Sequence, residues 1–183
     1  MGGSRLGGGI GGVLFDGYQI PSDARLREIQ VMSGWYIDSL RLLYSGPDGE
    51  IQGLALLGGK GGERHRFRLE VGEWLIGISG RCGTYVDSIR FHTNWRISPT
   101  YGGAGGDTEY LFLAPEDGEV VGFWGRADWY LDAIGILVRP VLGSRCIGQN
   151  WGQAPSAASQ QEPVSGNSMN SSALTPVGSR LTR

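Results

Sequence analysis

The stretch Gly8-Gly9-Ile10-Gly11-Gly12 is the first of three with the pattern Gly-Gly-x-Gly-Gly. The other two are Gly58-Gly59-Lys60-Gly61-Gly62 and Gly102-Gly103-Ala104-Gly105-Gly106, so their starts lie 50 and 44 residues apart. Glycine makes up 33 of the 183 residues, far above its usual share of about 7%, so a single such motif would carry little weight. Three copies at a similar spacing indicate an internal repeat.

A second pattern alternates with the glycine stretches along the chain. Each copy ends in aspartate: Gly34-Trp35-Tyr36-Ile37-Asp38, Gly83-Thr84-Tyr85-Val86-Asp87 and Asp128-Trp129-Tyr130-Leu131-Asp132. The starts lie 49 and 45 residues apart. Because two independent patterns share one period, with Tyr and Asp at fixed offsets, coincidence is a poor explanation. We therefore predict three copies of one structural unit.

Each unit has the residue pattern of β-strands. After each aspartate, alternate residues are mostly apolar, as in a strand with one face toward a core. Further strands are expected over residues 28–32, 73–78 and 119–124, and turns over residues 46–49 and 115–118. No stretch has a long 3.6-residue period. The sequence thus predicts an all-β fold with approximate threefold symmetry, in which each aspartate lies at the rim of the core where a strand begins.

The composition changes near Pro140. Only one aromatic residue, Trp151, follows it, and the last segment is rich in Ser, Gln, Asn and Pro. We expect one globular domain over residues 1–143 and a disordered tail over residues 144–183, which has too little apolar surface to offset its ordering entropy. No apolar run reaches the length of a signal peptide or a membrane span. A cytoplasmic location is expected, with non-classical release as an alternative.

Charge and residue counts exclude several classes of function. The net charge is −2 and the pI is about 5.7, with Lys and Arg scattered, so neither a nucleic-acid partner nor membrane binding is expected. Two histidines, His65 and His92, and two cysteines, Cys82 and Cys146, are too few and too scattered for a zinc site or a disulfide framework. We expect no cofactor or metal, and leave open whether Cys82 is exposed or buried.

The order and spacing of these motifs resemble the jacalin-related lectin family over roughly residues 6–139. The resemblance rests on the glycine stretches, on the three patterns that end in aspartate, and on Gly122-Phe123-Trp124-Gly125-Arg126 leading into residues 130–135. It implies a β-prism I of three four-stranded antiparallel sheets, with sugar sites formed by loops at one end. It also implies a non-catalytic, multivalent lectin for mannose- or glucose-containing oligosaccharides or glycoproteins, and a homodimer. Galactose-preferring relatives are cut near the first glycine stretch, which is uncut here.

The resemblance implies three carbohydrate-binding sites, each formed by one loop that ends in aspartate and one glycine stretch. In each, the aspartate would accept hydrogen bonds from two sugar hydroxyls, and a glycine N–H would donate to a third. The implied sets are Gly12 with Trp129, Tyr130 and Asp132, Gly62 with Trp35, Tyr36 and Asp38, and Gly106 with Thr84, Tyr85 and Asp87.

These residue types suit a sugar on physical grounds as well. A carboxylate forms charge-assisted hydrogen bonds about twice as strong as neutral ones. Glycine allows positive φ and brings a backbone N–H close to a ligand, and an aromatic ring can lie against the apolar face of a sugar. Because none of this requires proton transfer, we expect a site that holds its ligand, with no catalytic residue.

Asp128 departs from the pattern, because the other two loops begin with Gly34 and Gly83. Its carboxylate would crowd a ligand or repel Asp132. The same pair is the one place where two carboxylates would suit glycosidase chemistry, which we disfavour because each unit repeats only one aspartate. A second alternative is a β-prism interaction or targeting scaffold with weak or lost sugar binding. Whether the two loop tryptophans are exposed or partly buried is left open.

Overall fold

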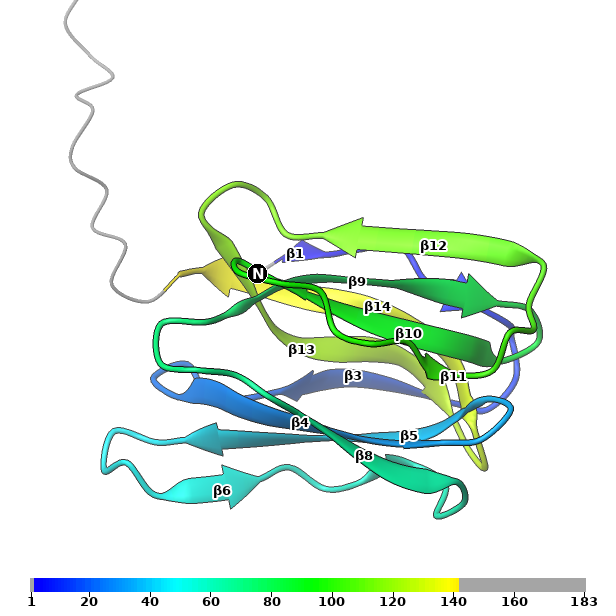
Figure 1. Ribbon diagram of the computed structural model, residues 1–183, viewed down its shortest axis with the longest axis horizontal. Coiled ribbons are helices and arrows are strands. Elements are labelled where there is room, and N and C mark those ends of the chain that lie inside the picture. The colour runs from blue at the N-terminus through cyan, green and yellow to red at the C-terminus, as the bar shows by residue number, and fades with distance from the viewer. Residues whose placement is uncertain (1, 142–183) are drawn as a thin grey trace, which may run out of the picture. The chain divides into compact units, whose positions relative to one another are not determined.

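The computed structural model describes residues 2–141, which form strands and turns without a helix (Figure 1). The predicted boundary at residue 143 and the predicted tail lie outside the described residues. In chain order the strands are β1 (Gly2–Gly3), β2 (Gly7–Gly8), β3 (Val13–Gln19), β4 (Arg25–Ser33), β5 (Ile37–Ser45), β6 (Ile51–Gly53), β7 (Leu57–Gly58), β8 (Glu63–Arg68), β9 (Leu75–Cys82), β10 (Val86–Thr93), β11 (Tyr101–Gly102), β12 (Thr108–Leu113), β13 (Gly118–Ala127) and β14 (Leu131–Pro140). Over this part of the chain, no helix is long and apolar enough to cross a membrane.

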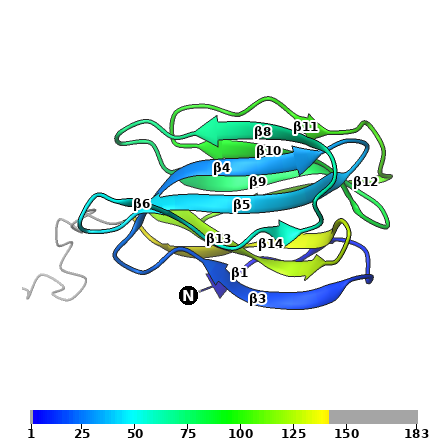
Figure 2. The same cartoon turned by 90° about the horizontal axis from the view of Figure 1, so that it is seen from below.

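The strands form three antiparallel sheets around a common interior (Figure 2). Their strand orders are β6-β5-β4-β8, β11-β10-β9-β12 and β1-β14-β13-β3. The expected all-β prism is confirmed. Two sheets have a fifth, short strand beyond the expected four, because one edge is interrupted: β6 and β7 both pair with β5, and β1 and β2 both pair with β14.

The core is built from equivalent positions of the three central hairpins. The predicted alternation of apolar residues after each aspartate is confirmed, and its side chains are fully buried. These are Leu40 and Leu42 on β5, Ile89 and Phe91 on β10, and Ile134 and Ile136 on β14. Burying such side chains stabilises the fold by about 1.5–3 kcal/mol each, so each unit contributes the same layer of one shared core.

Local signals in the sequence located the turns better than the strand ends. In the predicted turns, Gly49 N–H donates to the carbonyl of Gly46 at 3.0 Å, and Gly118 N–H donates to that of Pro115 at 2.9 Å. The strand expected to begin at residue 73 begins at Leu75 instead. Glu73 lies in a turn, where its N–H donates to the carbonyl of Glu70 at 3.0 Å.

The three loops that end in aspartate lie at one end of the prism, between β4 and β5, β9 and β10, and β13 and β14. In each loop, the N–H of the first residue donates to the carbonyl of the tyrosine, at 3.0, 2.9 and 3.0 Å from Gly34, Gly83 and Asp128. Asp128 therefore keeps the backbone turn that glycine makes in the other two units. The difference between the units lies in its side chain.

Candidate functional site

Each repeated aspartate is the second residue of a strand and is almost completely buried. The exposed fraction is 6% for Asp38, 5% for Asp87 and 4% for Asp132. A buried carboxylate is costly unless it is paired or hydrogen-bonded. Three such residues at equivalent positions therefore indicate a purpose other than packing.

Each carboxylate lies against the last glycine of one Gly-Gly-x-Gly-Gly stretch. The pairs are Asp38 with Gly62, Asp87 with Gly106 and Asp132 with Gly12, as the resemblance implied. A Cβ on Gly62 would lie 2.6 Å from Asp38 Oδ2, and one on Gly106 would lie 2.7 Å from Asp87 Oδ2. These glycines also have positive φ. Only glycine lets the backbone come this close to the carboxylate.

Two of the carboxylates have an oxygen without a hydrogen-bond partner in the described structure, namely Asp87 Oδ2 and Asp132 Oδ2. Leaving a buried acceptor unpaired costs about 1–3 kcal/mol. A ligand hydroxyl that donates to the carboxylate would offset part of this cost. The carboxylates of Asp87 and Asp132 can thus each accept a further hydrogen bond.

The electrostatic surroundings of the aspartates differ. Burial raises the pKa of Asp38, and the backbone N–H of Gly34 partly offsets that rise. Burial likewise raises the pKa of Asp87, which has Gly83 in the same role. For Asp132, burial and then the charge of Asp128 raise the pKa. The Asp132 carboxylate is therefore the one whose ionised form is opposed by a neighbouring charge from its own loop.

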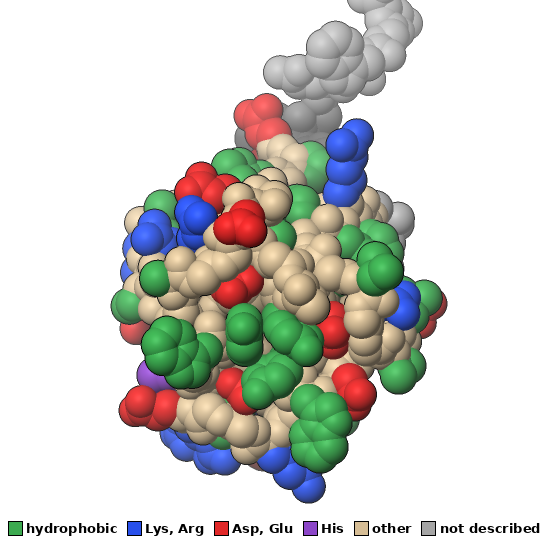
Figure 3. All heavy atoms as spheres, turned by 90° about the vertical axis from the view of Figure 1, so that its right-hand side faces the viewer, with side chains coloured by type: hydrophobic (Ala, Val, Ile, Leu, Met, Phe, Trp, Pro, Cys, Tyr) green, Lys and Arg blue, Asp and Glu red, His purple; other side chains and the backbone are tan. Residues whose placement is uncertain are grey.

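The loop tyrosines form a cluster at the centre of this face. The ring centroids of Tyr36, Tyr85 and Tyr130 are 5.0–5.3 Å apart in all three pairs. Figure 3 shows hydrophobic side chains at the centre of this end of the prism, with acidic side chains around them. Because the rings contact one another, they hold the three loops together. The rings occupy the centre of this face, so the loop backbones are what faces the candidate sites.

Both loop tryptophans are exposed, Trp35 by 83% and Trp129 by 78%. The alternative that they belong to the core is therefore wrong. Each glycine stretch also contacts the loop of another unit through its second glycine: Gly103 lies against the backbone of Trp35, Gly59 against Trp129 and Gly9 against Thr84. Neighbouring candidate sites are thus in direct contact, and one of them has threonine where the others have tryptophan.

Two hollows open at this end. One, of about 640 Å³, is lined by residues of two candidate sites: Gly34, Trp35, Tyr36, Asp38, Gly62, Asp87, Ala104, Gly105 and Tyr130. The other, of about 390 Å³, is lined by Gly11, Gly12, Tyr85, Asp128, Trp129, Tyr130 and Asp132. Both volumes are typical of small-molecule sites. The Asp38 and Asp87 sites share one hollow, whereas Asp132 and Asp128 share the other.

Two arginines that the sequence analysis did not assign to a sugar site hold two of the three glycine stretches. Arg126 donates from Nε to the carbonyl of Gly11 at 2.6 Å and from Nη2 to that of Gly12 at 2.9 Å. Arg81 donates from Nη2 to the carbonyl of Gly106 at 2.7 Å. Each arginine lies six residues before an aspartate, where the first unit has Met32. Aligning the three units would have revealed this position.

The remaining residues considered for metal binding or reactivity have other roles. Cys82 is buried, and burial raises the pKa of its thiol. The ring of His65 lies 5.5 Å from that of Tyr101. Within residues 2–141, no group of three or more His, Cys, Asp or Glu side chains could hold a metal ion.

The three sheets and the repeated aspartate–glycine pairs define a β-prism with candidate ligand sites at one end. Residues 4–137 match the family model of the jacalin-like lectin domain. The chain therefore belongs to the jacalin-like lectin family, as the resemblance in its sequence predicted.

Individual relatives agree with this assignment. Horcolin from Hordeum vulgare is 31% identical over 128 residues, which cover 66% of this chain and 86% of Horcolin. The structure of AcmJRL, a mannose-binding jacalin-related lectin from Ananas comosus, has 31% identity and a TM-score of 0.63, and covers 76% of this chain and 97% of that one. A Schizosaccharomyces pombe protein named as a candidate zinc metalloproteinase is 30% identical over 120 residues. The match covers 65% of this chain but only 18% of the yeast protein.

Proposed function

We propose that this chain is a non-catalytic lectin that binds mannose- or glucose-type sugars through up to three loop sites. The observation that carries the proposal is the threefold repetition of a buried aspartate against a glycine of positive φ. Membership in a lectin family supports the same reading.

The chemistry of each site follows from its donors and acceptors. An ionised aspartate accepts hydrogen bonds and cannot donate them, so it matches neighbouring sugar hydroxyls. The glycine stretch and the loop contribute backbone N–H groups without side-chain bulk. In this proposal the tryptophans beside the Asp38 and Asp132 sites offer a flat surface to the apolar face of a ring.

Two observations favour mannose or glucose over galactose. In the sequence, residues 2–7 lead directly into the first glycine stretch, where the resemblance implies that galactose-preferring relatives are cut. AcmJRL, with 31% identity, is described as mannose binding.

We further propose that binding is multivalent. A single monosaccharide buries little area, so its affinity should be weak, roughly millimolar to tens of micromolar. A branched glycan with several terminal mannoses would make its later contacts within one complex, and avidity can then rise about 10²- to 10⁴-fold. The hollow shared by Asp38 and Asp87 would let two branches bind side by side.

A glycan-array screen followed by calorimetric titration tests the proposal. The titration compares free mannose and the best array hit on the wild type and on Asp38→Ala, Asp87→Ala and Asp132→Ala. Asp16→Ala is the control, because Asp16 is exposed on β3. We expect a stoichiometry of up to three that falls by one with each site variant and stays unchanged in the control. Absence of glycan binding to the wild type would contradict the proposal and favour the interaction-scaffold alternative.

A further inference from the structure

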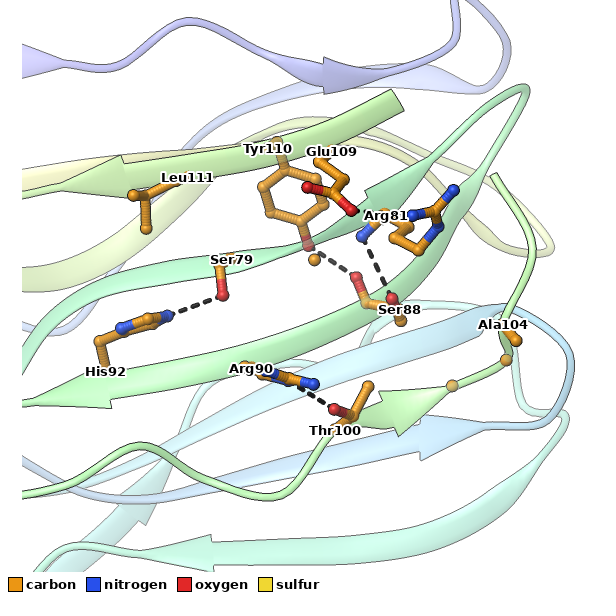
Figure 4. Close-up of a pocket in the computed structure, with 13 residues that line it drawn as sticks. Ser79, Arg81, Ser88, Arg90, His92, Thr100, Ala104, Glu109, Tyr110 and Leu111 are labelled. Carbon is orange, nitrogen blue, oxygen red and sulfur yellow. Dashed lines mark hydrogen bonds and ion pairs between the residues drawn. The ribbon is translucent and has the colours of Figure 1, made fainter. Parts of the chain in front are cut away.

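A third hollow lies outside the three loop sites, on the outer face of the sheet β11-β10-β9-β12. It has a volume of about 770 Å³, within the range of small-molecule sites. Figure 4 shows that it runs along the strands, with His92 and Leu111 toward one end and Arg81 and Ala104 toward the other. We refer to it as the β9–β10 groove.

The groove exists because the residue at the middle of this face is small. Register places Gln30, Ser79 and Trp124 at equivalent positions of β4, β9 and β13. The ring of Trp124 covers Gly135, and Gln30 donates from Nε2 to Glu28 Oε1 at 2.9 Å. The outer faces of those two sheets are therefore filled at this position by large side chains. Ser79 leaves the third face open.

The walls of the groove combine positive charge with an apolar surface. Arg90 and His92 lie on β10, and the exposed Leu111 lies across the groove on β12. Arg90 donates from Nε to the hydroxyl of Thr100 at 2.5 Å, and His92 Nε2 is 2.7 Å from Ser79 Oγ. Both contacts are with neutral groups.

The other charges that face the groove largely cancel. Arg81 forms an ion pair with Glu109 at 2.9 Å, so the pair adds little net charge. The guanidinium of Arg90 then gives the groove a net positive charge. An anionic group placed beside it would gain charge-assisted hydrogen bonds.

The groove adjoins the Asp87 site. Ala104, the middle residue of the third glycine stretch, lines both the groove and the hollow that holds Asp87. The other two stretches have Ile10, which is 94% exposed, and Lys60 in this position. The residue between the loop site and the outer face of the sheet is therefore small only at the Asp87 site, where its side chain is a single methyl group.

We propose that the β9–β10 groove binds an acidic sugar residue of an oligosaccharide whose terminal sugar is held at Asp87. This inference rests on the proposed lectin function. The carboxylate of the acidic residue lies beside Arg90, its hydroxyls reach Ser79 and Thr100, and its C–H face contacts Leu111. The oligosaccharide crosses from one subsite to the other over Ala104.

The test compares two matched sets of disaccharides by calorimetry. In one set glucuronic acid is linked to mannose through each available position, and in the other glucose replaces glucuronic acid at the same linkage. The proteins are the wild type, Arg90→Gln and the control Arg41→Gln. Arg41 is the equivalent residue on β5, where its Nε donates to the carbonyl of Leu54 at 2.9 Å.

For at least one linkage, we expect the acidic disaccharide to bind the wild type about three- to fivefold more tightly at low salt, as for a solvent-accessible ion pair. Arg90→Gln should abolish this preference, and Arg41→Gln should preserve it. Neither change should alter the affinity for free mannose. In addition, the Hε1 signal of His92 should shift with the acidic disaccharide and not with the neutral one, because His92 lines the groove beside Arg90.

Two outcomes separate this inference from the proposed function. If mannose binds at Asp87 but no linkage shows an acidic preference, or if Arg90→Gln leaves that preference intact, the groove assignment is wrong and the lectin function stands. If mannose does not bind and Asp87→Ala changes nothing, the proposed function itself fails. Ser79→Gln is a second variant, since it fills the groove with the residue that β4 carries there. It should remove the acidic preference while mannose still binds.

Discussion

Arg81 donates from Nη2 to the backbone carbonyl of Gly106 at 2.7 Å, while Gly106 lies against the carboxylate of Asp87. One side chain of β9 thus ties down the glycine stretch that faces the aspartate. The third unit has the same arrangement through Arg126, whereas the first unit has Met32. The three candidate sites are alike in their aspartates and unequal in what supports their glycine stretches.

Replacing Arg81 with methionine should weaken sugar binding at the Asp87 site by roughly three- to tenfold. The change removes hydrogen bonds worth about 0.5–1.5 kcal/mol each and frees the glycine stretch from Arg81. Met32→Arg is the reciprocal variant, and it should strengthen the Asp38 site. Calorimetry on variants that retain a single intact aspartate measures each effect. Equal affinities in Arg81→Met and the wild type would show that the stretch holds its position without the arginine.

Asp128→Gly should strengthen the Asp132 site by about two- to fivefold, the range expected for removing an exposed like charge. The loop turn should not change, because Asp128 already makes the hydrogen bond that glycine makes elsewhere. Gly34→Asp transfers the same side chain to the Asp38 site and should weaken it. A Cβ on Gly34 meets no other atom within 4 Å, so the fold should tolerate it. Binding to variants with one intact aspartate, at low and high salt, measures both effects.

On acidification, sugar binding should be lost at a higher pH than it would be if the three aspartates had ordinary pKa values. The pKa values of Asp38, Asp87 and Asp132 are raised above the usual 3.8, and only the ionised form accepts hydrogen bonds at both oxygens. For Asp132 the charge of Asp128 adds to the effect of burial, so Asp128→Gly should move the loss of binding at that site to lower pH.

This loss should not reflect unfolding. A carboxylate whose pKa is raised in the folded state destabilises the fold when it is ionised, so its protonation favours the folded state. Titrations with mannose between pH 7 and pH 4, followed by circular dichroism on the same samples, separate binding from unfolding. A midpoint at or below 3.8 for all three sites would contradict the prediction.

Gly106→Ala should eliminate binding at the Asp87 site and lower the free energy of unfolding by about 1–2 kcal/mol. Its φ is +77°, a conformation that costs an L-residue roughly that much, and the new Cβ would lie 2.7 Å from Asp87 Oδ2. Gly83→Ala is the control for stability, since a Cβ there has no contact closer than 3.7 Å. Urea unfolding and calorimetry together distinguish a closed site from an unfolded protein.

Glu73→Gln should destabilise the protein at neutral pH. The Glu73 side chain is fully buried and Arg96 Nε lies 2.8 Å from its Oε1. Burial alone would raise the pKa of Glu73, but hydrogen bonds from Arg96, the N–H of Glu70 and Thr93 lower it to about 2. The folded pKa is below the unfolded value, so this contribution, about 2–3 kcal/mol, is present above pH 4.5 and lost as the pH falls toward 2.

Urea unfolding at pH 7 and at pH 2.5 tests this contribution. The wild type and Glu73→Gln should differ at pH 7 and converge at the lower pH. Glu109→Gln serves as the control, because its side chain is 78% exposed and an exposed ion pair adds little. If the difference in free energy of unfolding between the wild type and Glu73→Gln did not depend on pH, Glu73 would stabilise the fold through packing and not through its charge.

The sequence by itself determined the repeat, the fold class and the aspartate–glycine motifs. These features are readable because each depends on a local requirement: alternating apolar residues make a strand with one buried face, and glycine is required where φ is positive. The same requirement recurs in every unit, so the motif recurs as well. Asp38 and Gly62 could be paired from the sequence only through the resemblance to a known family.

Only the tertiary structure decided which contacts between distant segments distinguish the units. Arg126 and Gly11 are 115 positions apart and form a hydrogen bond, and no local pattern predicts such a contact. The exposure of Trp35 and the open groove over Ser79 likewise depend on which side chains of other strands reach them. Contacts between distant segments set these properties, because a side chain is buried or exposed according to what folds over it.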